Sequence, residues 1–143
     1  MFVLLVGCQS NQHHEDQLLP TQEVNEILQL QFSVELSSVT PTGLKYLVEN
    51  CDNPGTIWSY GSSFHLEYLG KDGWTVVDYL SVSPLWAQVL ISVSSGNTSS
   101  QEVDWTQIYG ELSSGTYRIV KDFTRTEGET AKKYTLFADF KIL

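Results

Sequence analysis

The sequence predicts an all-β fold, an antiparallel β-sandwich of seven to nine strands with Greek-key connections. Apolar residues recur at every second position from Leu30 onward, which places them on one face of a strand. Turn residues separate these segments at short intervals, and no segment has a convincing helical period. A Ser-Ser-Gly turn at 113–115 also leads into an alternating segment that begins with Tyr117, a pattern typical of a sandwich with a tyrosine corner.

The first half of the domain contains five short segments with the spacing of strands. Thr40-Pro41-Thr42-Gly43 and Asn53-Pro54-Gly55 are expected to form turns between them, and Lys71-Asp72-Gly73 a hairpin turn because Asp-Gly tolerates positive φ. In the first segment Leu36 is expected to face inward with Leu30. The predicted strands are 30–36, 44–48, 57–60, 64–68 and 74–77.

The second half predicts four more strands. A Gly-Asn-Thr-Ser-Ser loop at 96–100 separates the first two, and a charged loop is expected at 124–130 before the closing strand. The predicted strands are 87–93, 101–105, 117–123 and 133–142.

The tyrosine corner is predicted from Leu112, Gly115 and Tyr117. In such a corner the ring lies beneath the edge of the sandwich and its hydroxyl bonds to nearby backbone. These residues are therefore assigned a structural role. Trp74 and Trp105 are expected to fill the core, as is the Tyr117 ring.

Composition limits the classes of function. The chain has 143 residues, enough for one domain with a sizeable core plus a tail. Its 17 acidic and 8 basic residues give a net charge of −9, which disfavours binding to the phosphate backbones of nucleic acids. No stretch approaches the roughly 20 apolar residues that a membrane-spanning helix needs.

The N-terminus predicts a three-part organisation. Residues 1–8 form an apolar run ending in Leu5-Val6-Gly7-Cys8, which resembles a bacterial lipobox, although it lacks a basic n-region and a full h-region. Residues 9–28 are polar and read as a flexible tether, with at most a helical turn at 23–28. Residues 29–143 form the sandwich. A lipid on Cys8 would hold the domain at a membrane outside the cytoplasm.

Cys51 is then expected to be a lone thiol in a turn, since its neighbours Asp52, Asn53 and Pro54 favour turns. A Cys8–Cys51 disulfide is the alternative, and a tail cysteine beside an apolar signal disfavours it. Without an activating partner, Cys51 is not predicted to be a nucleophile.

No residue pattern predicts catalysis, a metal or a cofactor. The serine pairs lie in turns, and His65 alternates with apolar residues, so it is expected on the outside of a strand. Residues 13–16 (His-His-Glu-Asp) have metal-ligating atoms, but adjacent side chains on a tether do not preorganise a site. The scattered aspartates lack the spacing of a calcium loop.

Aromatic residues are the best functional lead. Trp58 and Tyr60 share one face of a short strand, and Trp86 follows a Ser-Pro-Leu segment at a loop edge. Exposed together, such rings could stack on sugars or anchor a peptide. These three residues are the candidate binding surface, with core packing as the alternative for each.

The domain resembles a family of bacterial immunoglobulin-like domains found in surface lipoproteins and in extracellular parts of bacterial membrane proteins. The resemblance covers about residues 30–143 and implies an Ig-like sandwich without an assigned catalytic activity. It carries over no ligand residues. The matching segments are 39–44 (VTPTGL), Tyr60-Gly61 with Phe64 and Leu66, Gly73-Trp74, 103–105 with 109–112, 115–121 (GTYRIVK) and 138–142 (ADFKI).

We therefore expect a lipid-anchored, extracytoplasmic Ig-like domain that acts as a non-enzymatic binding or interaction module, with an unidentified protein or glycan partner. Two alternatives stay open. One is a protease inhibitor that presents the 79–86 connection, with Trp86, or the 94–100 loop. The other is a carbohydrate-binding module that uses the candidate aromatic surface.

Overall fold

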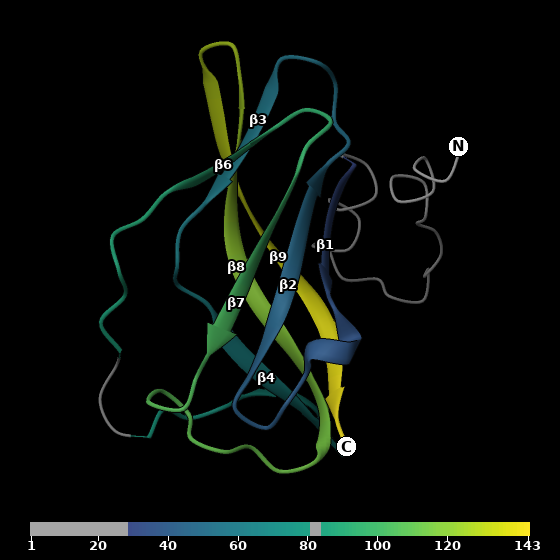
Figure 1. The fold of residues 1–143 in the computed structure, drawn as a ribbon, viewed down its shortest axis with the longest axis vertical. Helices are drawn as coiled ribbons and strands as arrows, with labels where there is room; N and C mark the ends of the chain where they lie inside the picture. Colours follow the sequence, from purple (N-terminus) through teal and green to yellow (C-terminus); the bar gives the residue numbers. More distant parts are fainter. Residues whose placement is uncertain (1–28, 81–83) are drawn as a thin grey trace.

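The computed structural model describes residues 29–80 and 84–143, which form two facing antiparallel sheets (Figure 1). Their nine strands confirm the predicted fold class, an all-β antiparallel sandwich. The predicted signal and lipobox at 1–8, the tether at 9–28 and the acidic-histidine cluster at 13–16 lie outside the described residues. In the described part of the chain, no helix is long and apolar enough to cross a membrane.

The smaller sheet has three strands, in the order β1-β2-β7. They are β1 (Leu30–Val34), β2 (Gly43–Asn50) and β7 (Thr98–Asp104). β1 is two residues shorter than the predicted strand 30–36, because the chain turns into a 3₁₀ helix at Leu36–Ser38. The prediction that Leu36 faces inward is therefore wrong: its side chain lies on this turn and is exposed.

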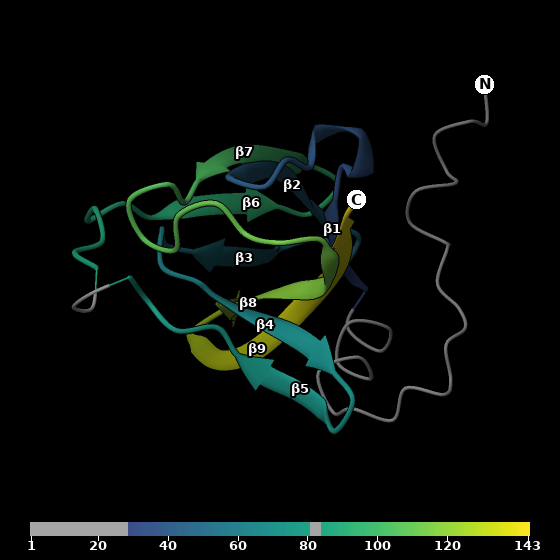
Figure 2. The same ribbon diagram turned by 90° about the horizontal axis from the view of Figure 1, so that it is seen from below.

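The larger sheet has six strands, in the order β5-β4-β8-β3-β6, and β9 pairs with β8. Seen from below, the β2–β7 layer lies over the layer that contains β8, β4 and β9 (Figure 2). The strands are β3 (Thr56–Tyr60), β4 (His65–Gly70), β5 (Gly73–Val76), β6 (Ile91–Ser94), β8 (Gly115–Glu127) and β9 (Thr130–Ile142).

The β8–β9 hairpin is longer than the sequence predicted. The two strands pair from Gly115↔Ile142 to Glu127↔Thr130, so the charged loop expected at 124–130 is wrong. The turn is confined to two residues, where Gly128 adopts φ +62°. The charged residues in this stretch predict a loop, whereas the structure places them on the paired strands and the turn of an exposed hairpin.

The core lies between the sheets and is rich in aromatic rings. Phe32 of the small sheet lies with its ring centroid 5.1 Å from that of Phe123 in the large sheet, and Tyr46 lies 6.0 Å from Tyr60. Such tilted and edge contacts stabilise a sandwich beyond the burial of area alone. Trp105 is buried as predicted, and its indole N–H donates to the Pro41 carbonyl at 2.9 Å.

The tyrosine corner is present. The buried Tyr117 ring donates its hydroxyl to the carbonyl of Ser113 at 2.8 Å, and Leu112 donates its N–H to Pro41. Gly115 is required here because an added Cβ would lie 2.7 Å from the Tyr68 ring. The structural roles predicted for Leu112, Gly115 and Tyr117 therefore match their positions.

Trp74 does not lie in the core, contrary to the prediction. It is half-buried on the outer face of the large sheet, where the Arg118 guanidinium lies 4.3 Å above its ring and 4.4 Å from the Phe137 ring. Arg118 also pairs with Glu67 at 2.7 Å. Trp74 thus faces outward and is partly covered by the Arg118 guanidinium, a contact that the alternation of apolar residues does not predict.

Cys51 is disulfide-bonded, so the expectation of a lone thiol is wrong. The sequence has one other cysteine, Cys8, outside the described residues. Cys51 also donates its backbone N–H to the Gln29 carbonyl at 2.9 Å.

Candidate functional site

Two of the three predicted binding residues are part of the core. Trp58 and Tyr60 are 0% and 3% exposed, because β3 turns alternate residues between the sheets and leaves Ile57 outside. The Trp58 indole donates to Asp52 at 3.0 Å, and the Tyr60 hydroxyl lies 2.6 Å from the Ser99 hydroxyl. The prediction that Trp58 and Tyr60 form a binding surface is wrong, since neither ring can meet a ligand.

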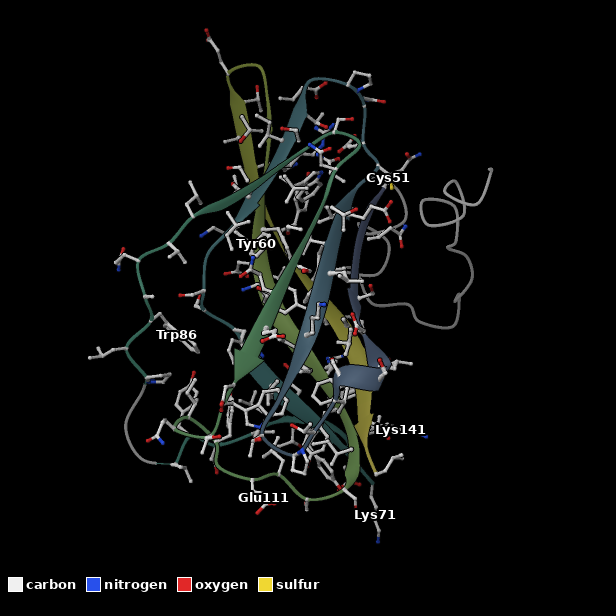
Figure 3. All side chains as sticks on the ribbon, in the orientation of Figure 1. Cys51, Tyr60, Lys71, Trp86, Glu111 and Lys141 are labelled. Carbon is white, nitrogen blue, oxygen red and sulfur yellow. The ribbon has the colours of Figure 1, made fainter. Side chains whose placement is uncertain are left out.

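Trp86, the third predicted residue, lies in the long connection between β5 and β6. Its side chain is half-buried, and its ring centroid lies 5.1 Å from that of the buried Phe64. Figure 3 shows Trp86 pointing from this connection toward the body of the sandwich, well apart from Tyr60 in the interior. The three rings therefore do not form one surface.

Trp86 borders a break in the large sheet. Both β3 and β4 pair with β8, but between Ser59↔Thr124 and His65↔Val120 five residues (60–64) face three on β8 (121–123). The two extra residues interrupt what would otherwise be one long strand, and we call this interruption the bulge. Bulges commonly lie beside functional sites because they redirect side chains and free backbone groups.

A cleft of about 380 Å³ opens at this break, and we call it the bulge cleft. It combines aromatic, hydroxyl and charged side chains from β4, β8, β9 and the β5–β6 connection. Its lining residues are Ser63, Phe64, His65, Tyr79, Trp86, Val120, Lys121, Asp122 and Thr135.

Lys121 forms the inner wall of the bulge cleft and is only 2% exposed. Its ammonium donates to the carbonyls of Gly61 and Ser63 at 2.8 Å each, and lies 5.2 Å and 5.5 Å from the ring centroids of Tyr60 and Tyr46. Burial lowers the pKa of Lys121 to about 8. The ammonium thus satisfies the two carbonyls that the bulge removes from strand pairing.

The outer side of the bulge cleft carries one exposed carboxylate, Asp122. The exposed Asp122 carboxylate accepts a hydrogen bond from the Thr135 hydroxyl at 2.6 Å. His65, on the outer face as predicted, lies 2.8 Å from Glu67. Burial raises the pKa of Glu67, but the bonds from His65 and Arg118 outweigh it and hold that pKa below its usual range. Glu67 is therefore ionised near neutral pH.

The β5–β6 connection covers the bulge and exposes apolar side chains beside it. The Ser62 hydroxyl donates to the Ala87 carbonyl at 2.7 Å, and a Cβ added to Gly61 would lie 3.3 Å from the Val89 carbonyl oxygen. We call its exposed apolar residues the apolar rim. They are Leu80, Leu85, Val89 and Leu90, which are 63%, 99%, 50% and 73% exposed.

The charged side chains at the cleft are engaged in hydrogen bonds within the domain. The Lys121 ammonium is turned toward backbone carbonyls, and the Asp122 carboxylate is paired with a threonine hydroxyl. Among residues 29–80 and 84–143, no three His, Cys, Asp or Glu side chains are grouped so as to hold a metal ion. The predicted signal for this site was Trp86 alone. Lys121 was missed, although its place between Ile119 and Phe123 marks an inward position on the strand.

The fold is an antiparallel sandwich with a cleft at the break in its large sheet. The chain belongs to the bacterial Ig-like domain family, since the family model "Bacterial Ig-like domain" matches residues 26–141. Domains of this family are typically non-catalytic and usually lie outside the cytoplasm. The resemblance inferred from the sequence is confirmed by this match. No curated protein matches the chain.

Two solved structures are similar in overall outline. The first is the ASH/PapD-like domain 7 of human CEP192, with 8% identity, a TM-score of 0.42, and 94% of this chain and 95% of that chain covered. The second is the CooA pilin subunit from enterotoxigenic Escherichia coli, with 13% identity, a TM-score of 0.32, and coverage of 78% and 88%. At these scores neither likeness bears on function.

Proposed function

We propose that this domain is a non-enzymatic interaction module that contacts another macromolecule outside the cytoplasm through the β5–β6 connection. The observation that carries the proposal is the apolar rim. Four apolar side chains, each at least half exposed, lie on one connection, and Leu85 is 99% exposed. Keeping such side chains in water costs free energy, and several exposed apolar side chains along one segment are a typical mark of an interaction site.

A photo-crosslinking amino acid tests this proposal in cells. Placed at position 85, it is expected to form a crosslink to another macromolecule. Placed at position 71, in the β4–β5 turn at the opposite end of the large sheet, it serves as the control. Absence of crosslinks from position 85, or equal crosslinking from both positions, would refute the proposal.

We further propose that a lipid on Cys8 holds the module at the membrane. The lipobox-like Leu5-Val6-Gly7-Cys8 segment and the polar residues after it support this anchor. A diacylglyceryl group supplies two acyl chains, and two chains anchor far more firmly than one. A tethered module also reaches its partner at a raised local concentration.

The disulfide of Cys51 competes with this anchor, because one sulfur atom cannot both bond to a lipid and bond to another sulfur. Mass spectrometry of the intact protein from membranes, with and without reductant, separates the two uses. The anchor requires a diacylglyceryl mass on Cys8. A mass that rises by only two hydrogen atoms on reduction, with no diacylglyceryl group, instead assigns Cys8 to the disulfide and refutes the anchor. Either modification fits an exported protein, since disulfides persist in oxidising compartments.

A protease inhibitor is a second candidate function that one observation favours. Of the two loops predicted to be presented, 94–100 is wrong as a loop, because β6 ends at Ser94 and β7 begins at Thr98; the short turn between them is held by the Ser95 hydroxyl bond to the Asp52 carbonyl. The other connection projects Leu85, while Trp86 packs inward. Inhibition of a protease in a panel, lost in Leu85→Gly, would support it. No inhibition at micromolar concentration would remove it. The carbohydrate-binding alternative fails because Trp58 and Tyr60 are buried.

A further inference from the structure

We infer that the partner of this module presents an apolar side chain next to a lysine or arginine, and that the bulge cleft with its apolar rim is the site that receives them. This inference rests on the proposed function and specifies the chemistry of the partner. The partner is a protein segment, since the same short stretch must carry both kinds of side chain.

The apolar half of the site comes from adjacent residues of one connection. Trp86 lines the cleft and packs against Phe64, so its position is set by the core. Leu85 precedes it and is fully exposed, and Tyr79 lines the same cleft. A partner side chain that packs against Leu85 and the accessible part of the Trp86 ring would bury area on a ring that is already held, which costs little side-chain entropy.

The polar half of the site selects a cation. Asp122 is the exposed carboxylate of the cleft, and its second oxygen is not used by the Thr135 bond. Glu67 lies behind His65 and is paired with Arg118, so it adds no net negative charge there. The buried Lys121 ammonium donates to the Gly61 and Ser63 carbonyls and not to Asp122, so the Asp122 carboxylate stays open to a partner's cation, although the Lys121 charge also acts on it. The whole chain, at −9, attracts basic partners as well.

The bulge explains why both halves meet. Two extra residues separate β3 from β4 along β8, and the β5–β6 connection is held against this break by the Ser62 hydroxyl bond to the Ala87 carbonyl. The same break exposes the side of β8 that carries Asp122. A continuous strand would close this gap, and the apolar and acidic groups would then lie on separate surfaces.

The test uses the full chain and three unstructured octapeptides on a Gly-Ser background. One contains two leucines and two lysines, the second replaces lysine with glutamate, and the third replaces leucine with serine. Binding is followed by the NMR signal of the Trp86 indole N–H and by the amide signals of 84–90. The leucine–lysine peptide is expected to shift these signals in a saturable way, and the other two at least tenfold more weakly.

Paired variants locate the site. Leu85→Ser and Asp122→Lys are each expected to weaken binding of the leucine–lysine peptide about tenfold, equivalent to roughly 1.4 kcal/mol. Leu36→Ser and Glu129→Lys make the same changes at an exposed leucine and an exposed acid elsewhere, and are expected to leave binding unchanged. Unaltered amide spectra away from each substitution establish that every variant is folded.

Four results would overturn the inference. They are equal binding of the glutamate peptide, shifts confined to another surface such as the groove beside Tyr68 and Val76, self-association that accounts for the shifts on dilution, and binding to phosphatidylcholine vesicles in place of the peptide. Crosslinks from position 85 in cells would leave the proposed interaction function standing in each case, so the two failures are distinguishable.

Discussion

Strand β8 carries two mostly buried cations four residues apart, and they are held in opposite ways. Arg125 makes a two-point ion pair with Asp52, at 2.7 Å from Nε and 3.1 Å from Nη2, and Asp52 also accepts from the Trp58 indole. Lys121 meets no carboxylate in the described ion pairs and donates to two neutral carbonyls. In the first region β8 pairs without interruption with both β3 and β9, and the second region is a bulge with an open cleft.

The difference shows what a buried charge does in each place. A paired charge with satisfied hydrogen bonds is compatible with a closed, regular structure, whereas its removal leaves the partner unpaired. An ammonium among carbonyls replaces the missing strand pairing, and burial without an acid lowers its pKa to about 8. The Asp52–Arg125 ion pair thus stabilises the uninterrupted part of the large sheet, whereas the bulge beside Lys121 leaves a cleft open to solvent.

Removal of the Asp52 carboxylate should cause the largest loss. Asp52→Ala is expected to lower the free energy of unfolding by about 3 kcal/mol, because it leaves the mostly buried Arg125 guanidinium and the Trp58 indole without their acceptor. Chemical denaturation of the variant at pH 7 measures this loss. A decrease below about 1 kcal/mol would mean that the ion pair is solvated, and that the contrast with Lys121 is wrong.

The same carboxylate predicts an acid-dependent stability. Burial raises the pKa of Asp52, but bonds from Arg125, the Asn53 N–H and Trp58 outweigh it and hold the pKa below its usual range. A depressed pKa stabilises the fold above the unfolded value of about 4, and the contribution is lost as pH falls through the folded pKa. As the pH falls from 5 to 2, the free energy of unfolding of wild type should therefore decrease more steeply than that of Asp52→Ala. Parallel profiles would contradict this.

Lys121→Met should have the next largest effect, a loss of about 1–2 kcal/mol at pH 7, because the carbonyls of Gly61 and Ser63 lose their donor while the packing volume is kept. Denaturation curves measure it. Lys121 also predicts the sign of a pH effect. Its folded pKa of about 8 lies below the unfolded value of about 10.4, so the unfolded chain holds the proton longer.

Stability of wild type should therefore rise relative to Lys121→Met as pH increases from 8 to 10. The difference between the two profiles isolates this group from the tyrosines, which both proteins share. If the difference instead shrinks with rising pH, the two carbonyls and the tyrosine rings stabilise the charged ammonium more than burial opposes it.

Tyr117→Phe should have a smaller effect, about 1 kcal/mol. It removes the hydroxyl bond to the Ser113 carbonyl and keeps the ring stacked at 5.7 Å on Phe140. Thermal unfolding detects the change. A loss above 3 kcal/mol would show that the corner, rather than the Asp52 ion pair, dominates the stability of the closed region.

The apolar rim should show the smallest effect on stability. Leu85→Ser is expected to change the free energy of unfolding by less than about 0.5 kcal/mol, because the side chain is 99% exposed and packs against nothing in the described domain. Leu36→Ser, on the 3₁₀ turn, is the matched control. A loss at Leu85 above about 1 kcal/mol would mean that this side chain is packed in solution.

Much of the fold was readable from two-residue periodicity and turn chemistry, as β2 and the closing strand β9 illustrate. The errors have a common cause. Alternation shows that Trp58 and Trp74 each share a face with the residues two positions away, but it does not show which face lies inward. The candidate site was found only through Trp86, because the bulge that forms the cleft arises from a register difference between β3 and β4 along β8.

The amino-acid sequence by itself determined the antiparallel sandwich, its tyrosine corner and its acidic charge, because alternation, turn residues and composition are local properties of the chain. Only the tertiary structure decided that Trp58 and Tyr60 are buried, that Lys121 fills a break in the sheet, and that Asp122 meets Trp86 at one cleft. These arrangements depend on how distant strands pair in register, and register is a property of the assembled sheets.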